Sequence, residues 1–147
     1  MLKRSNKLVV ISMAFLGASL GVPSAFPGEL CFEIHEIKPR EGIVMVSIVN
    51  TETAFEEGGP NIASLLLPTH VESISACVGD LEEGAYGIRV MQDLDDDGSM
   101  GTNLVGMPIE PWGTSNDAKG SFGPPSWDDA RFHLDAQGAT QSITLNH

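Results

Sequence analysis

The sequence predicts an all-β domain, an antiparallel β-sandwich with one long acidic loop rich in glycine and proline. Apolar and polar residues alternate in several short runs, and helical periodicity is almost absent. Sixteen glycines and nine prolines among the 147 residues separate these runs, as is typical of strands joined by turns. The length fits one domain.

The first segment, residues 1–25, has the layout of a secretory signal peptide. Basic residues precede an apolar stretch from Leu8 to Leu20, and small residues stand at Ser24 and Ala25. The stretch is shorter than the ~20 residues that cross a bilayer. We therefore expect export to the periplasm or the extracellular space, cleavage near residues 24–25 and no stable membrane span afterwards. An N-terminal membrane anchor is the alternative. Residues 26–147 form the expected domain.

The chain is strongly acidic, with a formal net charge of -12 and a pI near 4.5. Removing the signal peptide leaves five basic residues against twenty acidic ones, a formal net charge of −15. Nucleic-acid binding is excluded because it needs a basic surface, and docking on anionic lipid is disfavoured for the same reason. The expected partners are an envelope component, whose identity the sequence leaves unknown, or a small ligand.

The first half of the domain contains the opening strands. Residues 30–37 and the β-branched run 43–49 are expected to form a hairpin around the turn at residues 39–42. Residues 62–67 fit either a short helix or a strand. Residues 71–78 read as a third strand.

The second half begins with a fourth strand at 85–92, after a tight turn over residues 80–84. Residues 93–126 show no strong periodicity, and loops of this length are usually functional or tied down by a ligand. Residues 130–134 and 141–145 read as two closing strands, with a turn at Gln137-Gly138.

The two cysteines, Cys31 and Cys77, lie in strand-like runs, and each stands out of phase with the apolar residues around it. Cysteines that point away from the core are better explained by pairing than by packing, and export permits a disulfide. We therefore predict a Cys31–Cys77 disulfide, with two separate buried thiols as the alternative.

The acidic loop is the main chemical feature. Asp93, Asp95 and Asp97 alternate before Gly98, a spacing that matches the first half of a calcium loop. Crowded carboxylates repel each other, and a bound Ca²⁺ would cancel that repulsion. We predict a Ca²⁺ site from the oxygens of Asp93, Asp95, Asp97, Ser99 and Asn103. A solvated acidic turn is the alternative.

The second half of that calcium pattern is incomplete, because Leu104 stands where the pattern requires a bidentate glutamate. No amphipathic helices flank the loop either. Any closing ligand must come from elsewhere in the segment, and the candidates are Asn103, Glu110, Asn116, Asp117, Asp128 and Asp129.

Three motifs, GAYGIRVMQD at 84–93, TNLVGMPIEPWGTSN at 102–116 and GPPSWDDA at 123–130, occur in order around this loop. In this order the chain resembles the domain-of-unknown-function 2141 family of exported bacterial proteins over roughly residues 28–145. The resemblance implies a β-sandwich akin to transthyretin-like and carboxypeptidase-regulatory-like modules, a location outside the cytoplasm and no established catalytic activity. The expected fold class is therefore a transthyretin-like or immunoglobulin-like sandwich. Family members often carry Asp at the position of Gly101, which puts one expected ligand in doubt.

Two function classes remain open. The first is a non-catalytic exported domain whose Asp-rich loop binds Ca²⁺ for structural stabilisation. The second is a carbohydrate- or peptide-binding module, for which the candidate residues are Glu110, Trp112, Ser115, Asn116 and Trp127, with aromatic stacking on the tryptophans. Enzyme signatures are weak. The chain has no G-x-S-x-G elbow and no metal-binding histidine spacing, so we expect no catalysis.

Overall fold

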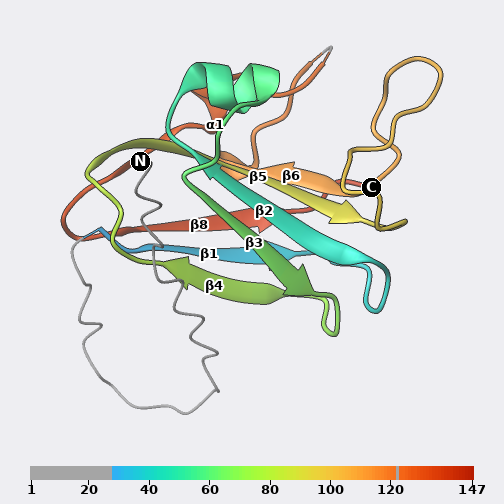
Figure 1. Cartoon of the computed structure of the whole chain (residues 1–147), viewed down its shortest axis with the longest axis horizontal. Coiled ribbons are helices and arrows are strands. Elements are labelled where there is room, and N and C mark those ends of the chain that lie inside the picture. Colours follow the sequence, from blue (N-terminus) through green and yellow to red (C-terminus); the bar gives the residue numbers. More distant parts are fainter. Residues whose placement is uncertain (1–27, 122) are drawn as a thin grey trace, which may run out of the picture.

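The computed structural model describes residues 28–121 and 123–147, which form two β-sheets packed face to face (Figure 1). One sheet has the strand order β4-β1-β8, and the other has the order β3-β2-β5-β6, with β7 also paired to β5. The predicted β-sandwich is confirmed. The predicted signal peptide, residues 1–25, lies outside the described residues. The strands are β1 (Leu30–His35), β2 (Ile43–Val49), β3 (Ala63–Pro68), β4 (Ile74–Val78), β5 (Gly84–Asp93), β6 (Trp112–Thr114), β7 (Phe132–Leu134) and β8 (Ala139–Thr144).

The main core lies between the sheets and follows from the alternation in the sequence. In β1 the buried residues are Leu30, Phe32 and Ile34, and in β2 and β5 the even-numbered apolar residues, such as Val46 and Ile88, point the same way. Side chains alternate between the two faces of a strand. The opposite residues of β2 and β5 therefore form the outer face of their sheet.

The expected opening hairpin is wrong, because β1 and β2 belong to different sheets. The connection between them crosses from one layer to the other, and Ile37 within it is buried in the core. The buried side chain of Gln92 fixes this connection. Its Nε2 donates to the carbonyls of Lys38 and Glu41, both at 2.7 Å, and its Oε1 accepts from the Lys38 amide at 2.9 Å.

The closing strands also separate, since β7 pairs with β5 while β8 pairs with β1. The β1–β8 pair is parallel, which makes it the exception among otherwise antiparallel neighbours. The turn at Gln137-Gly138 is present, with the Gly138 amide bonded to the Asp135 carbonyl at 3.1 Å. Beyond β8, Asn146 and Trp112 exchange two backbone hydrogen bonds and so join the two sheets at one corner.

The segment 93–126 contains more regular structure than its lack of periodicity suggests. It includes β6, which pairs with β5, and the short 3₁₀ helix η2 (Ser115–Asp117). A one-turn helix, α1 (Trp127–Ala130), follows it, and the ambiguous residues 62–67 fall largely in β3. Of these elements, β6, η2 and α1 have only three or four residues each and are too short to carry a detectable period.

The predicted disulfide is confirmed, with Cys31 and Cys77 joined across the antiparallel β1–β4 pair. The two residues face each other directly in the register, on the side of the sheet away from the core. Within the described residues no helix is both long and apolar enough to cross a membrane.

Candidate functional site

The acidic loop leaves the end of β5 and brings three carboxylates together. One oxygen from each of Asp93, Asp95 and Asp97 lies within 4.8 Å of the others. Asp93 is 2% exposed, whereas Asp95 and Asp97 are open to solvent. The cluster therefore combines one fixed carboxylate at its base with two exposed ones above it.

Backbone amides of the loop hold this arrangement. Asp93 accepts from the amide of Asp97 at 3.2 Å and from the amide of Gly98 at 2.7 Å. Asp96, at φ 59, and Gly98, at φ 77, both adopt the left-handed conformation, which turns the loop sharply and which glycine adopts at little cost. Asp95 and Asp97 each accept from an amide two residues further on. The loop is thus wound around its carboxylates.

Glu110 closes the base of the loop. Its side chain is buried, and its two oxygens accept from the amides of Leu94 at 2.8 Å and Gly101 at 2.9 Å, one on each arm of the loop. Among the candidate closing residues, Glu110 is the one whose side chain forms hydrogen bonds with the backbone of residues 93–101.

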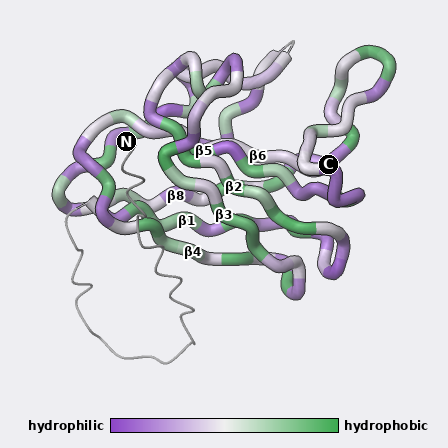
Figure 2. The backbone as a smooth tube through the Cα atoms, viewed as in Figure 1, coloured by the Kyte–Doolittle hydropathy of each residue, from purple (hydrophilic) through white to green (hydrophobic). Residues whose placement is uncertain are grey.

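The two other residues proposed as Ca²⁺ ligands are Ser99 and Asn103. Ser99 is exposed on the loop, while the Asn103 side chain accepts from the amides of Val105 and Met107, both at 3.0 Å. Asn103 therefore caps the hairpin tip beyond the loop. This tip carries exposed apolar side chains at Leu104, Val105, Met107 and Ile109, and it is the hydrophobic end of the projecting loop in Figure 2.

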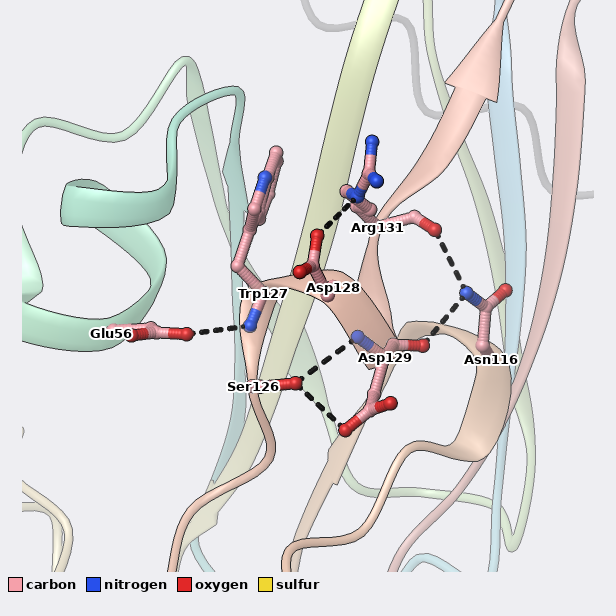
Figure 3. Close-up of polar contacts among 7 residues, drawn as sticks. All are labelled: Glu56, Asn116, Ser126, Trp127, Asp128, Asp129 and Arg131. Atoms are coloured by element: carbon pink, nitrogen blue, oxygen red, sulfur yellow. Dashed lines mark hydrogen bonds and ion pairs between the residues drawn. The ribbon is translucent and has the colours of Figure 1, made fainter.

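Three further candidate closing residues form hydrogen bonds or ion pairs outside the acidic loop. They are Asp117, Asp128 and Asp129. Asp117 accepts from the amide of Thr144 at 2.7 Å, and Asp128 pairs with Arg131 at 2.9 Å. Asp129 bonds to Ser126 at the start of α1 (Figure 3). None of these three carboxylates belongs to the loop cluster.

Negative charges crowd around Asp95 in the cluster. Loss of hydration and the charges of Asp97, Glu110 and Asp93 raise the pKa of Asp95, while a hydrogen bond from the Asp97 amide partly opposes this. The ionised form of Asp95 is therefore disfavoured beside these neighbours. A bound cation would reverse that preference.

Four of the five residues proposed for a carbohydrate or peptide have structural partners, and one of them is Glu110, which joins the arms of the acidic loop. The Trp127 ring packs against Phe55 with centroids 5.8 Å apart, beside Gly87. The Asn116 Nδ2 donates to the carbonyls of Asp129 and Arg131 (Figure 3). Ser115 is fully buried, with its hydroxyl accepting from the amide of Ile88 at 2.9 Å and donating to the carbonyl of Ala130 at 2.6 Å.

Replacing Ser115 with alanine is expected to lower the free energy of unfolding by about 1–3 kcal/mol, because a buried amide and a buried carbonyl lose their partner. Urea denaturation measures this loss. Ser142→Ala, on an exposed position of β8, is the matched control and is expected to change stability by less than about 0.5 kcal/mol. Equal stability of the two variants would contradict the bonding role of Ser115.

Trp112 lies in a different place, on the outer face of the β3-β2-β5-β6 sheet. There it lines a groove of about 430 Å³, whereas Glu110, Ser115, Asn116 and Trp127 do not. The cross-strand register sets Met45, Met91 and Trp112 side by side in one row. Met100 and Pro108 of the acidic-loop segment and Pro124 and Pro125 before α1 complete the mainly apolar lining.

Arg89 also lines this groove, and sequence reasoning missed it. Its Nη1 donates to the carbonyl of Phe55 at 3.1 Å, but its Nε is buried and has no hydrogen-bond partner among residues 28–121 and 123–147. Burial lowers the pKa of Arg89. The available signal was a single arginine at an outward-facing position among the apolar residues 88–91 of β5.

Together these features define the class of protein as a β-sandwich with an Asp-rich loop at the end of a central strand. The chain belongs to the DUF2141 family of uncharacterised proteins conserved in bacteria, whose family model matches residues 32–143. The resemblance drawn from the motifs is therefore confirmed. No curated protein and no solved structure matches the chain.

Proposed function

We propose that this protein is an exported, non-catalytic β-sandwich domain whose acidic loop binds Ca²⁺ and is stabilised by it. The observation that carries the proposal is the convergence of Asp93, Asp95 and Asp97 within 4.8 Å around the turn at Gly98. Hard cations such as Ca²⁺ take carboxylate and carbonyl oxygens. Export is supported by the signal-like residues 1–25 and by the disulfide, since disulfides persist in oxidising compartments.

The proposed site is open on one side. Asp93 supplies a buried carboxylate that already accepts two amides, and Asp95 and Asp97 supply exposed ones. Glu110 uses both of its oxygens to join the two arms of the loop, so it positions the loop rather than completing the coordination. With three carboxylates and water as the remaining ligands, we expect weak affinity, in the range of ~10⁻⁴–10⁻³ M typical of extracellular calcium modules.

Calcium binding is tested by isothermal titration calorimetry and by thermal unfolding of the purified protein. We expect saturable heat and a rise in melting temperature with millimolar Ca²⁺, because a ligand that binds only the folded state stabilises it. Absence of both effects would overturn the proposal.

Asp95→Asn and Asp97→Asn test the assignment, because each removes a charge and keeps a side-chain acceptor. Each is expected to weaken binding by about tenfold, since charge count sets the affinity of such sites. Asp96→Asn is the matched control. It makes the same charge change in the same loop, and Asp96 lies outside the cluster. Equal weakening of Ca²⁺ binding by all three variants would indicate a diffuse charge effect and not a site.

In the presence of a chelator, Asp95→Asn should raise the melting temperature, because the raised pKa of Asp95 marks a carboxylate that is destabilised when ionised.

The carbohydrate- or peptide-binding alternative has weaker support in the form that uses both tryptophans. Trp112 lines the groove on the sheet, whereas Trp127 packs against Phe55 and lines no part of that groove.

A further inference from the structure

The groove on the outer face of the β3-β2-β5-β6 sheet has an unusual floor. Ser47, Arg89 and Thr114 form one cross-strand row, and Met45, Met91 and Trp112 form the next row toward the acidic loop. Natural sheets that face solvent on one side usually carry polar residues there. Here one outer row is apolar and the other centres on an arginine.

Two loops turn this face into a groove. Gly98, Met100 and Pro108 come from the acidic loop and the hairpin that follows it, and Pro124 and Pro125 come from the segment before α1. The volume of this open groove, about 430 Å³, lies in the range of ~300–1,000 Å³ found for small-molecule sites. Such sites are mainly apolar, with a few fixed polar groups.

Arg89 supplies the fixed polar group. Its Nη1 is occupied by the Phe55 carbonyl, while its Nε–H is buried without a partner among the described residues. Nε and Nη2 form the edge of a guanidinium that binds a carboxylate through two parallel hydrogen bonds. A buried donor without a partner is rare and calls for a ligand or another explanation. Arg89 also makes no ion pair with any described residue.

The rest of the groove lining suits a ligand whose apolar part is an acyl chain or an aromatic ring. Met45, Met91 and Met100 are flexible, polarisable side chains that adapt to the shape of an apolar ligand. The Arg89 Nε is closed to solvent, so a carboxylate reaches it only when neighbouring side chains shift, and methionine side chains change conformation readily. Trp112 offers a flat, partly exposed ring beside them.

We propose that this groove binds a small apolar carboxylate, with the carboxylate on the free edge of the Arg89 guanidinium and the apolar body along Met45, Met91 and Trp112. The orientation follows from charge. The Arg89 row lies toward Phe55, and the methionine row lies toward the exposed aspartates of the acidic loop. The anionic end of the ligand is thereby placed at the end of the groove away from those aspartates.

Octanoate and 1-octanol are the matched probes, because they share an apolar chain and differ in charge. Titration calorimetry on the purified protein should show saturable octanoate binding, at least tenfold tighter than binding of 1-octanol. Charge-assisted hydrogen bonds in a desolvated site account for a preference of that size. Absence of saturable octanoate binding overturns the proposal. Equal affinity for the two probes also overturns it and indicates a neutral apolar occupant.

Variants at the floor of the groove test the role of the guanidinium. Arg89→Met should reduce octanoate affinity to the level of 1-octanol. Because this change also removes the hydrogen bond to the Phe55 carbonyl, Met91→Glu is the second variant. It places a carboxylate on the same face, two residues along β5, where it competes for the guanidinium, and should abolish octanoate binding in a folded protein. Wild-type affinity in either folded variant overturns the proposal.

Leu66→Glu controls for added negative charge. Leu66 is 62% exposed, pairs with Met45 across β2 and β3, and lies outside the groove lining. This variant should bind octanoate as the wild type does. If it loses binding as fully as Met91→Glu does, the effect is one of general charge and the proposed site is wrong. None of these measurements depends on Ca²⁺, so the groove and the metal proposal fail separately.

Discussion

Replacing both Cys31 and Cys77 with serine is expected to lower the free energy of unfolding by about 4 kcal/mol. The disulfide closes a loop with a sequence separation of 46 residues, and cross-linking such a loop removes entropy from the unfolded chain. The bond joins β1 to β4, which is an edge strand of its sheet and has no other strand neighbour in the described residues. The loss should therefore appear in global unfolding and in hydrogen exchange of β4.

Urea denaturation of the oxidised protein, the reduced protein and the double serine variant measures this effect. The reduced protein and the variant should have the same midpoint, well below that of the oxidised protein. A reducing agent should leave the variant unchanged, which makes the variant its own control. If reduction does not change the midpoint of the wild type, the disulfide does not stabilise the fold.

The disulfide also illustrates what the sequence alone specifies. Alternation assigns each residue to one face of a strand, and this was enough to place both cysteines away from the core. The same alternation predicted the sandwich and its buried residues. It does not specify which strands pair, because the β1 and β2 patterns fit a hairpin as well as they fit two separate sheets.

The pairing depends on contacts between distant residues. Gln92 fixes the β1–β2 connection from more than fifty positions away in the chain. A polar residue inside a strand gives no sign of such a partner in the sequence. The parallel placement of β8 beside β1 is likewise set by the packed core.

The candidate site was predictable to a similar extent. The spacing of Asp93, Asp95 and Asp97 before Gly98 identified the cluster, because the relevant contacts lie within six residues. The role of Glu110 at the base of the loop was one of several candidates, since it needs the chain to return after a hairpin. The groove at Arg89 could not be predicted, because three strands and two loops meet there.

Gly42→Ala is expected to destabilise the fold by about 3 kcal/mol and to disturb the acidic loop from outside it. Gly42 has φ +57, and a Cβ at this position would overlap the carbonyl oxygen of Asp93 and would lie 2.8 Å from the Cα of Leu94. The left-handed conformation costs an alanine about 1–2 kcal/mol. Relief of the backbone overlap adds a comparable amount. Chemical denaturation measures the sum.

Gly58→Ala separates the two contributions, because Gly58 has φ +78 and a Cβ added there would meet no atom within 4 Å. It should show only the conformational cost, about 1–2 kcal/mol. An equally small loss for Gly42→Ala would mean that the backbone at Asp93 shifts without resistance. In that case the end of β5 would not be rigid enough to hold Asp93 as a fixed carboxylate at the base of the cluster. A larger loss for Gly42→Ala, together with weaker Ca²⁺ binding, would tie the geometry of the loop to the β2–β5 pairing beneath it.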